Sequence, residues 1–228
     1  MFFDPITFLG YDLYHLAALF LIFSFLGWIV DVIGTSVHDG FYSDRGFLSL
    51  PLCPIYGFGA VFMISLLRPF SDNIPLLFLF SMLICTAWEL SVGLILKALF
   101  NDKWWDYTDE LFNFKGLICP KCSLYWGILG IFFFYCLLPL SEYAVDIIPF
   151  FAGILLILFI YFLAFVDTLN SLFCAIRKPE KKYIKTSTGF MYNLSQILGK
   201  SIANPAIGFV GKFKKLIRRS NNIRRFIR

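Results

Sequence analysis

The strongest constraint on this chain is a series of apolar runs, most of them about as long as a lipid bilayer is thick. A helix needs about 20 apolar residues to cross the hydrocarbon core. Runs that meet or approach this length lie at 13–35, 53–69, 74–100, 123–140 and 147–176. Only 15% of the residues are charged, against about a quarter in soluble domains. The sequence therefore predicts an all-α, polytopic membrane helix bundle with about five transmembrane helices.

The second run has the least secure beginning, because Pro51 and Pro54 precede it and Gly57 and Gly59 follow closely. Proline and glycine interrupt helices, and broken or re-entrant segments occur in membranes where protein covers them. The sequence leaves open whether this segment spans the membrane or re-enters. The N-terminus lacks the basic region and cleavage site of a signal peptide, so we expect the first run to remain as a span.

Charge divides the chain into a transmembrane domain, residues 1–176, and a basic tail, residues 177–228. The tail has 14 Lys and Arg against the single Glu180, a net charge of +13, whereas the first 176 residues have a net charge of −8. Basic segments stay on the cytoplasmic side of a membrane. With five spans, we expect a multi-pass protein of the cell membrane, its C-terminus cytoplasmic and its N-terminus outside.

The tail has apolar residues at helical spacing between Phe209 and Ile227, with Lys and Arg between them. This pattern is typical of an interfacial amphipathic helix on anionic lipid. A disordered basic tail that only orients the protein explains the charge equally well. We expect anionic headgroups as the tail's partner and do not expect nucleic acid, while a homo-oligomer remains open.

Three acidic residues fall inside apolar runs: Asp31, Glu89 and Asp167. All three lie in the cytoplasmic half of their predicted helices. An ionisable side chain within a span costs a few kcal/mol at the helix centre, so each marks a candidate functional site. Helix capping, an ion pair or contact with headgroup water explains Asp31 and Asp167 equally well. Glu89 is predicted to lie deeper, where an unpaired charge is more costly.

The two predicted cytoplasmic loops, 36–52 and 101–122, contain the other candidate substrate-binding residues. In the first, Asp44 and Arg45 lie in a segment rich in Gly and Pro, where Arg could hold a phosphate or carboxylate, orient the protein, or pair with Asp31. In the second, Trp105 and Asp106 precede Asn113. Paired tryptophans are commonly membrane anchors, but the adjacent acid also favours an ordered polar site.

Cys119 and Cys122 form a single CxxC motif, a weak candidate metal site because structural zinc needs about four ligands. Thioredoxin-like chemistry is expected near a βαβ pattern, which the sequence lacks. We therefore predict neither a metal nor a cofactor. The phosphate-binding loop of ATPases and the familiar hydrolase motifs are also missing, so an enzyme is the less favoured class.

Several motifs together resemble a known family. They are Gly27-Trp28-x-x-Asp31, Asp44-Arg45-Gly46-Phe47-Leu48, Cys53-Pro54-Ile55-Tyr56-Gly57, Trp88-Glu89, and Trp104-Trp105-Asp106-Tyr107 with Phe112-Asn113. Over residues 24–170 the chain is similar to the type IV ABC-transporter permease family of small bacterial membrane proteins. The resemblance implies a multi-span inner-membrane protein, and the family's name implies a separate ATPase subunit. The chain departs from the family in Asp31, where Glu is more frequent, in Asp44, where Asn is more frequent, and in the additional Cys122.

Our leading hypothesis is a transport subunit with a polar site near the cytoplasmic face, formed by Asp31, Arg45, Glu89, Asp106 and Asp167. One alternative is a membrane-embedded enzyme acting on a lipid or isoprenoid headgroup, in which an acid serves as general base. Another is a non-catalytic scaffold whose tail senses anionic lipid. The sequence does not distinguish the substrate or the direction of transport.

Overall fold

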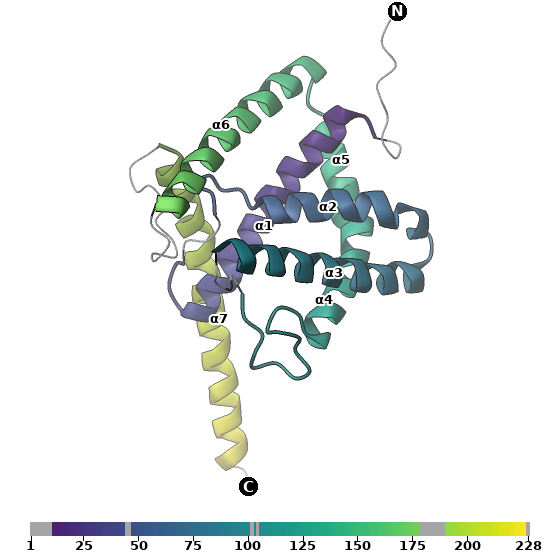
Figure 1. Ribbon diagram of the computed structural model, residues 1–228. Coiled ribbons are helices and arrows are strands. Elements are labelled where there is room, and N and C mark those ends of the chain that lie inside the picture. Colours follow the sequence, from purple (N-terminus) through teal and green to yellow (C-terminus); the bar gives the residue numbers. More distant parts are fainter. Residues whose placement is uncertain (1–10, 44–46, 101–102, 104, 178–189, 227–228) are drawn as a thin grey trace, which may run out of the picture. The chain divides into compact units, whose positions relative to one another are not determined.

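The computed structural model describes residues 11–43, 47–100, 103, 105–177 and 190–226. Figure 1 shows its helices: α1 Leu13–Asp39, α2 Pro54–Leu67, η1 Arg68–Phe70, α3 Ile74–Phe100, α4 Pro120–Phe132, η2 Phe133–Leu137, α5 Leu138–Asp146, α6 Phe150–Arg177 and α7 Phe190–Phe226. Within these residues no β-strand forms, and an isolated β-bridge joins Phe114 and Ile118. The predicted all-helical bundle is confirmed.

In the part of the chain that the structure describes, four helical segments are long and apolar enough to cross a membrane: Leu13–Asp39, Ile74–Leu99, Pro120–Asp146 and Phe150–Phe173. The remaining apolar run forms the shorter segment Pro54–Phe70, so its crossing is still a prediction. The segment Pro120–Asp146 is longer than the predicted 123–140 because α4 continues into α5 through the π-helical turn η2. A widened turn before Pro139 is a common way to accommodate a residue without a backbone N–H.

The chain forms two compact units, residues 1–24 with 54–160 and residues 25–53 with 161–228. The division at residue 176 stays a prediction. In the first unit, α3 packs against both α2 and α4 (Figure 1). Gly130 of α4 allows this closeness, since a Cβ atom there would lie 2.0 Å from Oγ of Ser81 on α3. Small residues let transmembrane helices approach to backbone distance in this way.

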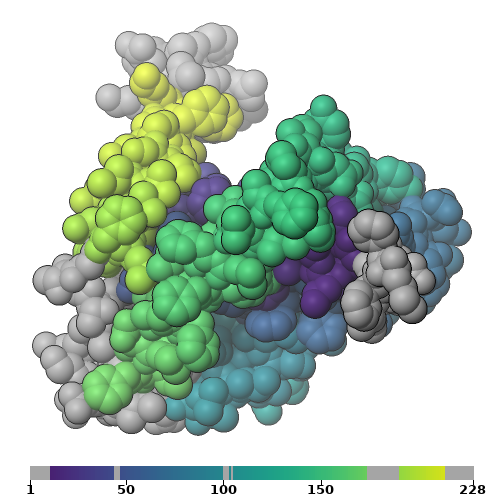
Figure 2. Space-filling view, turned by 90° about the horizontal axis from the view of Figure 1, so that it is seen from above, coloured from purple at the N-terminus to yellow at the C-terminus, as the bar shows by residue number. Residues whose placement is uncertain are grey.

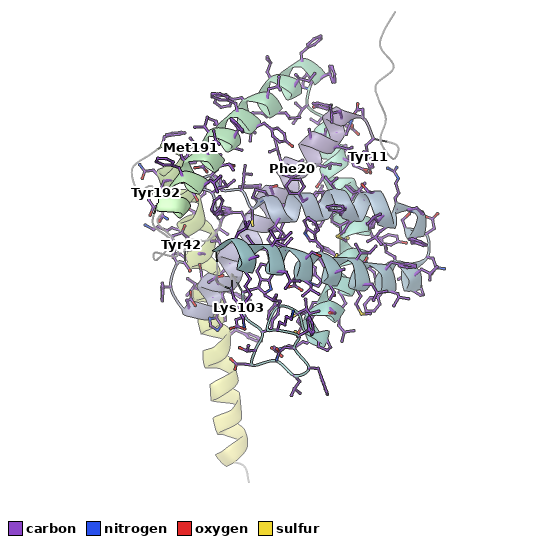
Figure 3. The ribbon with its side chains drawn as sticks, viewed as in Figure 1. Tyr11, Phe20, Tyr42, Lys103, Met191 and Tyr192 are labelled. Carbon is purple, nitrogen blue, oxygen red and sulfur yellow. The ribbon has the colours of Figure 1, made fainter. Side chains whose placement is uncertain are left out.

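The second unit contains α7, whose first half packs against the rest of this unit. Ser195 and Ala203 of this helix are fully buried, and Nζ of Lys200 lies 5.9 Å from the centroid of the Tyr42 ring. Figure 3 labels Tyr42 and, at the beginning of α7, Met191 and Tyr192. Within the tail, residues 190–226 form the helix α7. Whether this helix lies on a membrane surface and contacts lipid stays a prediction.

Helix α6 exposes large apolar side chains along its length, and much of this surface is visible in Figure 2. Phe151, Leu155 and Phe162 are 83%, 70% and 62% exposed. In water such a surface would be unfavourable, whereas lipid tails solvate it. The exposed apolar face thus agrees with a membrane-spanning α6.

The glycines supply a paired test of helix packing. We expect Gly130→Ala to destabilise the protein by about 1–3 kcal/mol, because its methyl group overlaps Ser81. Gly34→Ala in α1 is the matched control, since a Cβ there meets nothing within 4 Å and alanine favours helix. Thermal melting in detergent measures both variants. Equal melting temperatures for the two would contradict the close approach of α3 and α4.

Candidate functional site

Glu89 is the candidate site residue with the most complete set of partners. It lies on α3 and is 7% exposed. Its Oε1 accepts a hydrogen bond from the Tyr107 hydroxyl at 2.9 Å, and its Oε2 accepts one from Nε1 of Trp126 at 2.9 Å. Tyr107 belongs to the loop after α3, and Trp126 to α4. One carboxyl group therefore joins two helices and the loop between them.

Both donors to Glu89 are neutral, so they satisfy its oxygens without cancelling its charge. Among the residues that the structure describes, no Lys, Arg or His nitrogen forms an ion pair with it. Hydrogen bonds to a charged group contribute about 1.5–3 kcal/mol each, which offsets much of the cost of burial. Glu89 is thus stabilised by two hydrogen bonds, and no positively charged side chain among the described residues neutralises its carboxylate.

Tyr107 is held as a hydrogen-bond donor. Burial, followed by the negative charge of Glu89, raises the pKa of the Tyr107 phenol far above its usual value. The hydroxyl therefore keeps its proton at any physiological pH. Tyr107 belongs to the motif Trp104-Trp105-Asp106-Tyr107, and its role was not predicted from the sequence.

The loop after α3 folds back onto the helix that supports Glu89. Trp105 packs against Gly93, one helical turn beyond Glu89, where a Cβ would lie 3.1 Å from its ring. Its Nε1 donates to the Leu117 carbonyl at 2.9 Å. Trp105 therefore connects α3 with the end of the loop, so its role is structural, and membrane anchoring stays a prediction.

Asp106 and Asn113 hold the turn of the loop. Oδ1 of Asp106 accepts from Nζ of Lys103 and from the Thr108 amide, both at 3.1 Å. The hydrogen bond from Lys103 holds the pKa of the exposed Asp106 carboxyl below its usual range. Gly116 has φ +71°, and a Cβ there would lie 2.5 Å from Oδ1 of Asp106, so the turn needs glycine.

Asn113 is the second organiser of this loop. Its Nδ2 donates to the carbonyls of Thr108 and Glu110 at 3.0 and 2.9 Å, and its Oδ1 accepts from the Gly116 amide at 3.0 Å. These bonds occupy most of the side chain's capacity. Both Asp106 and Asn113 thus have structural partners, and their direct contact with a substrate remains a prediction.

The other two intramembrane acids belong to the second unit. Asp167 is 3% exposed, and its Oδ2 accepts from the Leu50 amide at 2.8 Å. Oδ2 of Asp31 accepts from the Cys53 thiol at 3.7 Å. Both acids therefore hold the short segment 50–53. Asp44 and Arg45 lie outside the described residues, and the single site of five residues stays a prediction.

The structure also shows a polar cluster that the sequence analysis missed. Nδ1 and Nε2 of His15 lie 2.6 and 3.0 Å from carboxylate oxygens of Asp12 and Asp146. Nearby, the Tyr11 hydroxyl donates to Glu142, and the Arg68 guanidinium lies 4.5 Å from the Tyr11 ring centroid. Figure 3 labels Tyr11, which lies just before α1.

This cluster comprises Tyr11, Asp12, His15, Arg68, Glu142 and Asp146. Burial and the hydrogen bond to Glu142 raise the pKa of Tyr11. The partners are about 130 residues apart in sequence, so periodicity gave no signal for them.

The cysteine pair completes the polar groups around the loop. Cys119 is 2% exposed and Cys122 is partly exposed, and both are free thiols. The described residues contain no group of three or more His, Cys, Asp and Glu side chains arranged to hold a metal ion. This donor set does not fit a structural zinc site.

Fold and site together define a multi-pass helical membrane protein with a buried carboxylate beside an ordered loop. Residues 18–172 match the model of a family described as Putative ABC-transporter type IV. The match covers more than half of the chain, which therefore belongs to this family and is an ABC-transporter-related membrane protein. No curated protein and no solved structure matches the chain significantly.

The hydrogen bonds of Asn113 lead to a test of the loop. We expect Asn113→Ala to loosen the turn and accelerate tryptic cleavage after Lys115 by about tenfold, because local opening exposes the backbone. Limited proteolysis followed by mass spectrometry measures the rate. Asp109→Ala, at an exposed neighbour on the same turn, is the control. Equal cleavage of both variants would show that Asn113 does not hold the loop.

Proposed function

We propose that this chain is the membrane-spanning, permease-like subunit of a transport system and that Glu89 provides the charge in its interior. The observation that carries this proposal is a buried carboxylate whose partners among the described residues are the neutral donors Tyr107 and Trp126. Acids inside spans mark substrate or ion pathways because their burial is costly. Family membership supports a transport role.

The chemistry of Glu89 favours a positively charged substrate group. An ionised carboxylate accepts hydrogen bonds and cannot donate them, so it complements an ammonium or similar cation. A phosphate or carboxylate would be repelled at this position. We therefore assign a cationic or zwitterionic group as the substrate class.

The orientation that best fits the charges has the C-terminus in the cytoplasm and the N-terminus outside the cell membrane. The tail's net charge of +13 supports this arrangement. It requires segment Pro54–Phe70 to cross the membrane despite its length. The loop after α3 is then cytoplasmic, and the tail can bind anionic headgroups.

A transport subunit without a nucleotide-binding loop needs a separate ATPase, and the loop after α3 offers a contact surface. At its tip Leu111 and Phe112 are 82% and 89% exposed. Phe112 adopts a φ of +56°, uncommon for an aromatic residue. The partners of Asp106 and Asn113 keep this tip ordered, which lowers the entropy lost on docking.

Purification of the full chain from native membranes tests the partner. We expect an ATP-hydrolysing subunit to copurify, and the double variant Leu111→Asp, Phe112→Asp to reduce its recovery about tenfold, because charge disrupts an apolar contact. The measurements are quantitative mass spectrometry and ATP hydrolysis in the eluate. Asp109→Ser is the control on the same turn.

Two outcomes would argue against this arrangement. If both variants recover the ATPase equally, the loop tip is not its contact. If no ATPase copurifies and the purified chain converts labelled lipid by itself, the lipid-headgroup enzyme replaces the permease.

Glu89→Gln tests the interior charge. Proteoliposomes containing the purified complex are supplied with ATP, and uptake of radiolabelled choline and glycine betaine is measured. We expect the variant to lower protein-dependent uptake at least about tenfold, because the neutral amide attracts a cation less. Glu110→Gln makes the same chemical change at a partly exposed site that pairs with Lys121. Unaltered uptake in folded Glu89→Gln, or no uptake of either probe by the unmodified complex, would contradict the assignment.

A further inference from the structure

The two cysteines of the CxxC motif meet at the beginning of α4. Cys119 is the N-cap residue, and its Sγ accepts from the Cys122 amide at 3.3 Å. The two Sγ atoms are 2.7 Å apart. At a helix N-terminus, amide dipoles stabilise a thiolate on the N-cap sulfur, which here is Cys119.

A chain of hydrogen bonds links this pair to Glu89. The Cys119 thiol donates to Sγ of Cys122. The Tyr107 hydroxyl donates to Oε1 of Glu89 at 2.9 Å and is also hydrogen-bonded to Cys122. Tyr107 therefore lies between the partly exposed Cys122 thiol and the buried carboxylate.

We propose that Cys119 and Cys122 form a reversible thiol–disulfide site that exchanges with small disulfides, with Cys122 as the attacking sulfur and Glu89 as the proton acceptor. Cys122 is partly exposed, whereas Cys119 is 2% exposed, so an external disulfide reaches Cys122 first. This inference goes beyond the transport proposal and does not depend on it.

The proposed exchange has two steps, one at each cysteine. The Cys122 thiol passes its proton through Tyr107 to Glu89, and its thiolate attacks a disulfide RSSR. One RS–S bond breaks, a bond from Cys122 to sulfur forms, and the first RS⁻ takes up a proton. Cys119 then loses its proton and attacks Cys122 Sγ, which releases the second RS⁻. Two thiols are oxidised, RSSR is reduced to two RSH, and no net proton is released.

The reverse reaction uses the same asymmetry. A thiolate that reduces the Cys119–Cys122 disulfide would attack the accessible sulfur of Cys122. Cys119 then leaves as a thiolate at the N-cap, where the amide of Cys122 stabilises it. A better-stabilised thiolate is a faster leaving group, so the site is reversible. Reversible disulfides are the kind found in reducing compartments, where such bonds are transient.

The purified full chain and 2-hydroxyethyl disulfide provide the test. Trypsin cuts after Lys121, between the two cysteines, so a disulfide leaves two peptides joined through sulfur. We expect these joined peptides to appear on oxidation and to disappear with dithiothreitol. Cys136, an exposed cysteine outside the pair, is the internal control and should give only a mixed disulfide. Absence of joined peptides while Cys136 reacts would overturn the proposal, and this result needs no variant to fold.

Single variants identify the attacking sulfur. We expect Cys119→Ser to retain a stable mixed disulfide on Cys122, and Cys122→Ser to form one on Cys119 about tenfold more slowly, because Cys119 is buried. Equal or faster reaction of Cys119 would reverse the assignment and overturn it.

Tyr107→Phe tests the proton path, with Tyr125→Phe as a matched change at an exposed tyrosine of α4. We expect Tyr107→Phe to slow the reaction of Cys122 about tenfold at neutral pH and not at alkaline pH, where hydroxide removes the thiol proton. A merely structural role would slow the reaction equally at both pH values. A rate equal to that of Tyr125→Phe throughout would remove Glu89 as the proton acceptor.

Discussion

The need to satisfy one buried carboxylate organises much of the first unit. Glu89 lies on α3, and without donors its burial would cost several kcal/mol. One donor comes from α4 and the other from the connecting loop, so the loop must fold back instead of extending into water. Gly93 and Gly130 make room for this return by letting the loop and α4 approach α3 closely. The close packing at the two glycines and the hydrogen bonds to Glu89 therefore stabilise the same arrangement of α3, α4 and the loop.

Lipid as a solvent explains why the helices could be predicted and the site only in part. Without water, backbone groups must pair locally, and apolar length alone then locates a span. The predicted 74–100 coincides with α3, and 147–176 differs from α6 by a few residues. The π-helical turn before Pro139 was not predictable, because hydropathy does not report backbone geometry. The length of α4 and α5 was underestimated for that reason.

For the site, the acids could be predicted from the sequence, but their hydrogen-bond partners could not. Asp31, Glu89 and Asp167 were recognisable, because a charge in an apolar run is conspicuous. Their partners were not, since Tyr107 and Trp126 lie 18 and 37 residues from Glu89 and neither is charged. A tryptophan inside a span does carry a signal, because its N–H needs an acceptor there. The cluster around His15 carried no comparable signal, since its acids lie near predicted helix ends, where acids are ordinary.

The position of Tyr107 limits how the proposed transport and the proposed thiol exchange can combine. Its hydroxyl donates to Glu89, the same carboxylate that is proposed to bind the cationic substrate group and to take up the Cys122 proton. A carboxyl group that already holds a proton or a cation is a weaker proton acceptor. Occupancy of Glu89 would therefore slow the reaction of Cys122, so the two activities would compete for one carboxylate.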